Sequence, residues 1–325
     1  MASSLVMEVI ETRRIWEHAP HNALPDMLWQ ANRMWCVLRE AESGESTHGL
    51  LRVIKSADGM TWESMAEFKS DVEDLRDPCL SLTPDGRLML VATGVRLHPK
   101  TQTHQSYVWF TKDGFIWSNP IPVADSNYWL WRVTWQKNIC YGIGYACGPQ
   151  KNTRLYRSRD GREFQPVMET LVAGGEPSEA ALIFQPDQKA LCLLQRNPFT
   201  GLLGTAMPPY RDWQWQDTKM CINDPQLCPL PGGKMATALR LHTPADRITL
   251  CLVDTKTGQL EECAGLPSGG DTGHPGLIWH QDFLWVVYHS SHAEKTAVYL
   301  SKISAHDSAL EPIASRRVPR PRKMQ

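Results

Sequence analysis

Long apolar runs are missing from this chain, and so is a clear excess of charge of either sign. No stretch approaches the ~20 consecutive apolar residues that a membrane-spanning helix needs. The 34 Lys and Arg nearly balance the 35 Asp and Glu, which leaves a formal net charge of -1. Such a balance provides no general attraction to nucleic acid or to an anionic membrane surface. We therefore expect neither nucleic acid nor a membrane among the partners of this protein.

Targeting and metal-binding patterns are missing as well. Residues 1–8 lack the basic start and the long apolar core of a secretory signal peptide. The chain has nine cysteines, and no two have the C-x-x-C spacing of a zinc site. Their number is odd and most lie in apolar segments, which favours buried free thiols in a reducing compartment. We expect a cytoplasmic protein without a metal ion or other cofactor.

A hairpin pattern is present six times, at intervals of about fifty residues. Each copy is an apolar run, a polar turn and a second apolar run. The turns contain Asn32, Asp85, Lys137, Asp187, Gly232 and Gln281, with steps of 53, 52, 50, 45 and 49 residues. A regular period of strand-like units predicts a radial array. We therefore predict an all-β fold, a six-bladed β-propeller of four-stranded antiparallel blades.

The six units fill nearly the whole chain, so residues 1–325 are assigned to a single propeller domain. The basic stretch at about 315–325 is interpreted as a solvated tail. The run from Val6 to Ile10 is expected to supply the last strand of the sixth blade, which would leave fewer exposed sheet edges.

Three successive units share a turn signature between their third and fourth strands. Ser56–Trp62, Thr111–Trp117 and Ser158–Phe164 all fit the pattern S/T-x-D-x-G-x-x-W/F. In such a turn the aspartate accepts backbone hydrogen bonds, the glycine takes a positive φ, and the aromatic ring packs back against the blade. These aspartates are therefore expected to be structural and not catalytic.

With these turns, which match the Asp-box or BNR repeat, the chain resembles the sialidase superfamily over almost its whole length. It is most similar to bacterial sialidase-like proteins of poorly defined function. The shared landmarks are Pro20–Ala23, Leu38–Glu40, Asp74–Pro78, Trp129–Trp135, Gly175–Ala180 and Gly269–Leu277. The resemblance implies a propeller fold and a carbohydrate ligand in the central pocket.

Charged residues gather at one predicted edge of the blades, because the first strand of an antiparallel blade starts where the second ends. The first strands bring His21, Asn22, Asp26, Arg76, Asp77, Arg132, Glu179 and His274 to this edge. The second strands bring Arg39, Glu40, Arg196, Arg240 and Tyr288. Arginine forks bind carboxylate or sulfate groups, and neighbouring carboxylates act as acid and base. We expect a pocket for an anionic, hydroxyl-rich ligand such as an acidic sugar.

The resemblance also implies roles for some of these residues. Sialidases hold the substrate carboxylate with three arginines, and they use an aspartate acid/base and a tyrosine nucleophile assisted by a glutamate. Glu179 stands in the place of that glutamate, and Arg196 and Arg240 stand in the places of two arginines. The place of the remaining arginine reads His21-Asn22-Ala23, and the place of the tyrosine is taken by His274. The resemblance therefore does not extend to the usual double-displacement mechanism.

A glycoside hydrolase is the first of three hypotheses. Arg196, Arg240 and Arg39 would hold the acidic group, with Arg76 or Arg132 as further candidates. Asp77 or Glu40 would be the general acid, and Glu179 the base or electrostatic partner. Unless Tyr145 or Tyr288 reaches the pocket, we expect an inverting mechanism, with carboxyl groups about 6.5–9.5 Å apart.

The two alternatives differ in their chemistry. The loss of the expected tyrosine favours a non-catalytic carbohydrate-binding propeller. A lyase or isomerase acting on uronate sugars would use His21 or His274 as its base, since histidine abstracts protons near neutral pH.

Overall fold

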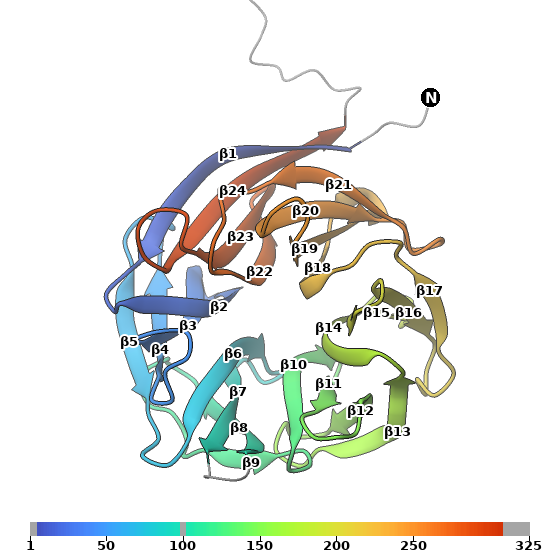
Figure 1. Ribbon diagram of the computed structural model, residues 1–325, viewed down its shortest axis with the longest axis horizontal. Helices are drawn as coiled ribbons and strands as arrows, with labels where there is room; N and C mark the ends of the chain where they lie inside the picture. Colours follow the sequence, from blue (N-terminus) through green and yellow to red (C-terminus); the bar gives the residue numbers. More distant parts are fainter. Residues whose placement is uncertain (1–4, 98–101, 308–325) are drawn as a thin grey trace, which may run out of the picture.

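The computed structural model describes residues 5–97 and 102–307. They form six four-stranded antiparallel sheets that are arranged radially around one axis, as Figure 1 shows. The described residues include a single short helix, the 3-10 turn η1 (Pro231–Gly233). The predicted six-bladed β-propeller is confirmed.

The first three blades follow the chain in order. Blade 1 contains β2 (His21–Gln30), β3 (Arg33–Ala41), β4 (Leu50–Ser56) and β5 (Glu63–Phe68). Blade 2 contains β6 (Asp74–Leu82), β7 (Leu88–Leu97), β8 (Gln102–Thr111) and β9 (Ile121–Val123). Blade 3 contains β10 (Tyr128–Gln136), β11 (Ile139–Ala146), β12 (Asn152–Ser158) and β13 (Gln165–Ala173).

The other three blades complete the ring. Blade 4 contains β14 (Glu176–Phe184), β15 (Ala190–Asn197), β16 (Leu202–Ala206) and β17 (Gln214–Asp217). Blade 5 contains β18 (Asn223–Pro229), β19 (Met235–Leu241), β20 (Arg247–Val253) and β21 (Leu260–Gly265). Blade 6 contains β22 (Thr272–His280), β23 (Phe283–Ser290), β24 (Ala297–Asp307) and β1 (Leu5–Trp16).

The ring is closed by β1, which carries the N-terminal run that the sequence assigned to blade 6. It pairs antiparallel with β24 from Leu5↔Asp307 to Trp16↔Val298. The first and last strands of the described residues therefore share one sheet. The predicted basic tail at about 315–325 lies outside the described residues.

The core lies between neighbouring blades. Val37 and Leu51 of blade 1, for example, are fully buried in one cluster with Leu90 and Trp109 of blade 2. Each sheet packs against two neighbours and so buries both of its faces. This explains why the second strands read as nearly continuous apolar runs instead of an alternating pattern.

The three turns with the shared signature have the same hydrogen bonds. The hydroxyls of Ser56, Thr111 and Ser158 accept a hydrogen bond from the backbone N–H of Gly59, Gly114 and Gly161 at 2.9, 3.0 and 2.9 Å. In each turn the aspartate, Asp58, Asp113 or Asp160, accepts two further backbone N–H groups. The aspartates are thus used within their own turns. These turns lie at the edge of the blades opposite to the start of the inner strand, which is the strand of each blade nearest the central axis: β2, β6, β10, β14, β18 and β22 (Figure 1).

The Gly114→Ala substitution is expected to destabilise the protein by more than its backbone strain alone. Gly114 has φ of 80°, and an added Cβ would lie 2.2 Å from the Trp35 ring. A non-glycine residue at such a φ costs about 1–3 kcal/mol, and the clash adds to that cost. Gly86→Ala is the control, because Gly86 has φ of 81° with nothing within 4 Å of an added Cβ. Urea unfolding of both variants measures the difference, and equal losses would contradict a role for the Trp35 contact.

Each inner strand is interrupted by a β-bulge at the same level. The irregularities lie between Ala23 and Asp26, Arg76 and Cys79, Leu130 and Arg132, Pro177 and Ala180, Asn223 and Gln226, and Gly273 and Gly276. In four blades the bulge holds a residue with positive φ that precedes a proline: Leu24 (φ 55°), Asp77 (φ 48°), Asp224 (φ 51°) and His274 (φ 54°). Bulges redirect side chains, and strained backbone often accompanies a functional site. The bulges therefore mark the place to look for a site.

Candidate functional site

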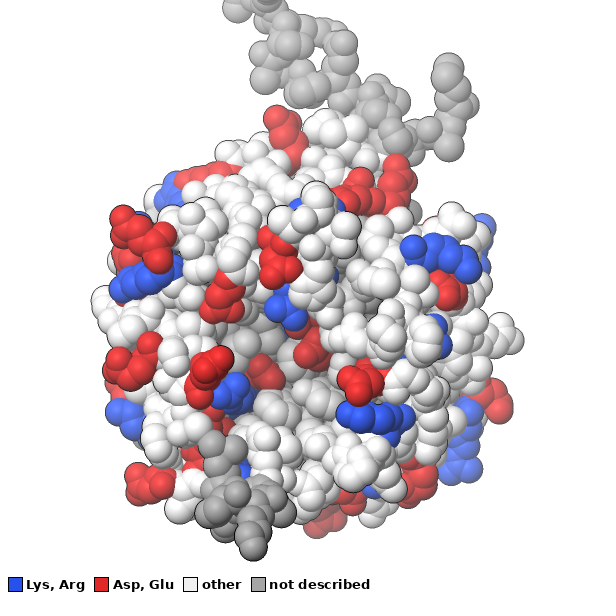
Figure 2. Space-filling model, viewed as in Figure 1, with Lys and Arg blue, Asp and Glu red and all other residues white. Residues whose placement is uncertain are grey.

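The bulges surround a hollow in the middle of the ring, which we call the central pocket. Figure 2 shows one face of the molecule hollowed near its centre, with both acidic and basic side chains around the hollow. The register confirms that the starts of the inner strands and the ends of the second strands share one edge, since His21 pairs with Ala41 and Thr272 with Ser290.

Glu179 and Asp224 form a carboxyl pair in the bulges of blades 4 and 5. The two side chains are hydrogen-bonded to each other, and the backbone N–H of Asp224 donates to Glu179 Oε2 at 3.2 Å. Asp224 Oδ2 accepts the backbone N–H of His274 at 3.1 Å and lies 3.2 Å from Nε of Arg240. The pair is thus held from blades 4, 5 and 6 together.

The two carboxyl groups have opposite pKa shifts. Burial raises the pKa of Glu179 well above its ordinary value, and the charge of Asp224 raises it further. Burial would also raise the pKa of Asp224, but Arg240 and the hydrogen bond with Glu179 lower it below its ordinary value. A proton shared by the pair is therefore held on Glu179 in preference to Asp224.

Asp77 and His274 face each other from the bulges of blades 2 and 6. Burial raises the pKa of Asp77 to about 7, although the positive charge of Arg76 opposes the rise. Burial lowers the pKa of His274 to about 3, so the imidazole is neutral. His274 Nδ1 lies 3.1 Å from the carbonyl oxygen of Pro25, so Nδ1 carries the proton and Nε2 the lone pair. This Nε2 lies 3.7 Å from Asp77 Oδ1.

A positive group lies beside these carboxyls because two arginines share one carboxylate. Asp74 accepts hydrogen bonds from Arg39 Nη2 at 2.8 Å and from Nε of Arg76. The Arg39 side chain is 1% exposed, whereas the Arg76 side chain is 29% exposed. Two guanidinium groups and one carboxylate leave one net positive charge, and Arg76 is the partner that a ligand can reach.

Arg240 and Arg196 have different surroundings. Arg240 lies at the carboxyl pair, and its Nη1 also donates to the carbonyl of Thr272 at 3.2 Å. Arg196 donates to the carbonyl of Thr200 at 3.3 Å, and its guanidinium lies 5.3 Å from the centre of the Phe199 ring. Arg196 is thus tied to the loop that follows its own strand.

Asp26 and Arg132 were predicted to bind ligand, but the structure uses them to connect blades. Arg132 Nη1 lies 2.6 Å from Asp26 Oδ1, and Arg132 Nη2 donates to the carbonyl of Pro275 at 3.2 Å. The other oxygen of Asp26 accepts the backbone N–H of Leu80 at 2.8 Å. Four blades meet at this buried ion pair, which leaves neither side chain free for a ligand.

His21 and Asn22 lie where blade 6 meets blade 1. His21 Nε2 is 2.7 Å from Asp271 Oδ2. The side chain of Asn22 is bonded to both backbone groups of Ala19 and to the carbonyl of Thr296. The predicted ligand-binding role of Asn22 therefore does not fit, because its amide is fully used in fixing the loop before β2.

Glu40 and Tyr288 are also placed away from the carboxyl pair. Both oxygens of Glu40 are bound by Arg52, at 2.9 and 2.8 Å, and Trp16 Nε1 donates to one of them at 2.6 Å. Tyr288 is fully buried between blades 5 and 6 and donates to the carbonyl of Pro267 at 2.8 Å. Both oxygens of Glu40 are thus already used in contacts within the protein, so its carboxyl is not placed to be the general acid.

Tyr145 supplies a hydroxyl near the carboxyls. Burial raises the pKa of Tyr145 well above its ordinary value, and the negative charges of Asp77 and Glu179 raise it further. Its ring stacks on Trp129 at 5.9 Å between centres and lies 6.4 Å from Trp131. The tyrosine thus comes from the second strand of blade 3 and not from the start of blade 6.

Asp224 was not among the candidates predicted from the sequence. A signal for it exists, because Leu24-Pro25, Asp77-Pro78, Asp224-Pro225 and His274-Pro275 all place a residue before a proline at the start of an inner strand. The step from residue 24 to 77 is 53 and the step from 224 to 274 is 50. Comparing these X-Pro pairs across the repeats would have aligned Asp224 with Asp77 and His274.

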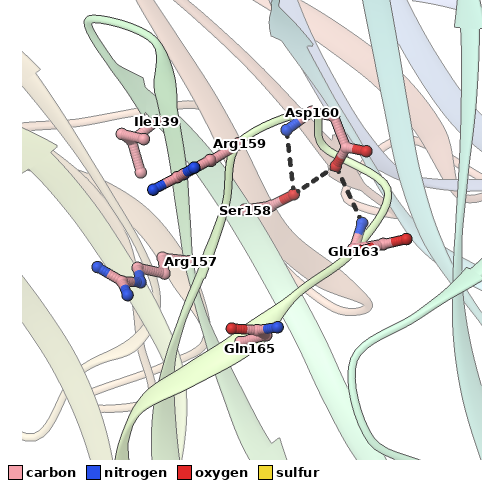
Figure 3. Close-up of a pocket in the computed structure, with 7 residues that line it drawn as sticks. All are labelled: Ile139, Arg157, Ser158, Arg159, Asp160, Glu163 and Gln165. Carbon is pink, nitrogen blue, oxygen red and sulfur yellow. Dashed lines mark hydrogen bonds between the residues drawn. The ribbon is translucent and has the colours of Figure 1, made fainter.

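A second cavity, of about 380 Å³, lies at the other end of blade 3. Figure 3 shows that Ser158, Asp160 and the backbone of Glu163 hydrogen-bond with one another inside the turn. The cavity opens where β12 ends, whereas the carboxyl pair lies at the starts of the inner strands. It is therefore separate from the central pocket.

Residues 5–97 and 102–307 contain no helix that is long and apolar enough to cross a membrane. In the same ranges, no group of three or more His, Cys, Asp or Glu side chains is arranged to hold a metal ion.

Comparison with known sequences gave no match, neither to a family model nor to a curated protein. Solved structures do resemble the chain. A protein of unknown function from Dyadobacter fermentans has a TM-score of 0.81 at 17% identity, over 92% of this chain and 99% of that one.

Two enzymes are among the other similar structures. The α-L-arabinanase of Penicillium chrysogenum, solved with arabinobiose, has a TM-score of 0.67 at 14% identity, over 92% of this chain and 98% of that one. The sialidase of Trypanosoma rangeli, solved with the inhibitor DANA, has a TM-score of 0.70 at 13% identity, and the match covers 93% of this chain and 60% of the enzyme. At these identities the likeness is one of fold, and it is shared by sialidases and arabinanases alike.

Proposed function

We propose that this protein is a glycoside hydrolase that acts on an anionic sugar or glycoside in the central pocket. The observation that carries the proposal is the set of three carboxyl groups with separated pKa values, Glu179, Asp224 and Asp77. Titratable groups whose environments push their pKa values apart are typical of acid and base pairs in enzymes. The fold neighbours that cleave sialosides or arabinans agree with this class of reaction.

The proposed reaction assigns one step to each group. Asp77, protonated near neutral pH, gives its proton to the glycosidic oxygen as the bond to the anomeric carbon breaks. The Asp224–Glu179 pair removes a proton from the attacking water, whose oxygen forms the new bond to that carbon. The products are the free sugar and the released alcohol, and the proton that water lost restores the acid. This scheme is an inverting hydrolysis. It gives Tyr145 no role as a nucleophile, because burial raises the pKa of its hydroxyl well above the ordinary value.

The preference for an anionic sugar rests on the charges around the pocket. Asp26 neutralises Arg132, and Asp224 pairs with Arg240. The unmatched positive charge is at Arg76, which is partly exposed. Arg76 Nε donates to Asp74 and its Nη2 donates to the carbonyls of Ser46 and Gly44. A carboxylate or sulfate on the substrate would therefore pair with this guanidinium through Nη1.

A release assay tests the proposal. The wild-type protein and the Asp77→Asn variant are incubated with sialosides, uronides and neutral glycosides, with Asp71→Asn in an exposed loop as the control. Turnover of an anionic glycoside that is lost only in Asp77→Asn would support a hydrolase. Binding without turnover in the wild-type protein would instead indicate a carbohydrate-binding propeller.

Activity is expected to decrease as the pH rises through about 7, because Asp77 must be protonated to act as the acid. Above that pH, kcat/KM should fall about tenfold per pH unit. Arg76 lowers the pKa of Asp77, so Arg76→Gln should move this alkaline limb to higher pH. A kcat/KM profile that stays flat up to pH 9 would contradict the role of Asp77.

A further inference from the structure

A side pocket of about 280 Å³ lies between blades 3 and 4, next to the central pocket. Its walls come from the ends of β11 and β15, the starts of β10 and β14, and the β11–β12 loop. Trp129, Tyr145, Lys151, Glu176 and Asn197 are among the residues that line it. Neither the carboxyl pair nor the central arginines belong to this lining, so the space is not used by the proposed reaction.

A row of aromatic rings connects the side pocket to the central pocket. His104 and Trp129 lie 5.6 Å apart, Trp129 stacks on Tyr145 at 5.9 Å with an angle of 7°, and Tyr145 lies 6.4 Å from Trp131. Trp131 in turn lies 4.8 Å from His274, the residue that faces Asp77. The row therefore runs from the outer pocket to the reacting groups without interruption.

The chemistry of the side pocket suits a neutral ring with hydroxyl groups. Trp129, which is 8% exposed, and Tyr145 give the pocket an apolar wall, against which the C–H face of a sugar can pack. Lys151 and Glu176 form an ion pair at 3.3 Å and are both at least half exposed. Since the pair is neutral as a whole, it offers donors and acceptors without favouring an anion. Pockets that combine aromatic walls with a few polar groups are typical of small-ligand sites.

We propose that the side pocket is a second sugar subsite, which binds a neutral ring linked to the anionic ring in the central pocket. The inference rests on the proposed function and deepens it, because it makes the substrate an oligosaccharide and not a simple glycoside. The aromatic row joins the wall of the side pocket to His274 of the central pocket, which places the two sugar sites side by side.

The Ala146→Trp substitution fills the side pocket without changing a carboxyl or an arginine. Ala146 lines the pocket at the end of β11. Ala146→Ser is the matched control, because it changes the same position but leaves the space open. Circular dichroism melts of both variants establish that they fold.

Calorimetric titration with paired sugars provides the test. Each pair is a disaccharide and the methyl glycoside of its anionic, non-reducing sugar: a sialylgalactose disaccharide and a glucuronyl disaccharide. We expect at least one disaccharide to bind about tenfold more tightly than its methyl glycoside. Ala146→Trp should abolish that gain and leave the affinity for the methyl glycoside within twofold, while Ala146→Ser keeps both.

Three results would overturn the subsite: equal affinity within every pair, a gain that survives Ala146→Trp, or no binding by any disaccharide. Hydrolysis of the methyl glycosides is measured separately and reports on the proposed function alone. If binding shows the gain and nothing is hydrolysed, the hydrolase proposal fails while the second subsite stands.

Discussion

The Glu179→Gln variant is expected to lose about 10²–10⁴-fold in kcat/KM on the glycoside that the wild-type protein cleaves, which is the usual range for removing a general acid or base. Glu179 holds the proton of the carboxyl pair, and its pKa is raised by burial and by the charge of Asp224. Glutamine keeps the size of the side chain and a donor for Asp224, but it cannot exchange a proton. The loss should therefore appear in kcat more than in KM.

Two comparisons separate this effect from damage to the fold. Glu163→Gln, an exposed glutamate at the far end of blade 3, should keep activity within twofold. Thermal unfolding of Glu179→Gln should show no loss, because an amide avoids the cost of a buried carboxyl beside Asp224. Full activity in Glu179→Gln would show that the proton on Glu179 takes no part in the reaction and would leave Asp224 as the acceptor.

The Asp26→Ala variant is expected to lower the free energy of unfolding by about 3–5 kcal/mol, the cost of leaving one member of a buried ion pair unpaired. Arg132 would keep its charge with only the carbonyl of Pro275 as partner, and the backbone N–H of Leu80 would lose its acceptor. Because these groups come from four blades, the loss affects the whole ring and not one sheet.

A double variant tests that explanation. Asp26→Leu combined with Arg132→Met removes both charges, so it should recover part of the stability that Asp26→Ala loses. Urea unfolding at 25 °C measures the free energy of unfolding of the wild-type protein, of Asp26→Leu and Arg132→Met singly, and of the double variant. A double variant as unstable as the sum of the single changes would show that the ion pair does not explain the loss.

Most of the fold was predictable because its determinants are local. The polar turns around Asn32, Asp85 and Lys137 separate short apolar runs, and all of them lie between an inner strand and the next strand. The turn of Thr111–Trp117 carries its own hydrogen-bonding groups. Such features act within a few residues, so reading the period was enough to place the blades.

The site was predicted less completely, and the reasons are particular. The sequence correctly predicted that the inner strand of a blade starts at the edge where the second strand ends. It did not show which charged side chains at that edge are paired with each other. Glu40 is bound by Arg52, twelve residues later, and Asp26 by Arg132, 106 residues later. Asp224 was missed because its partner Glu179 lies 45 residues away in another blade.

The sequence by itself therefore determined the number of blades, the order of the strands and the edge at which the polar residues collect. Turn chemistry and strand hydrophobicity depend only on near neighbours, and the repeat multiplies the same signal six times. Only the tertiary structure decided which carboxyls come together, which arginine stays partly exposed, and where the aromatic row leads. Those properties depend on how the bulges turn six inner strands toward one axis, and on burial and charge contributed by residues that meet only when the ring closes.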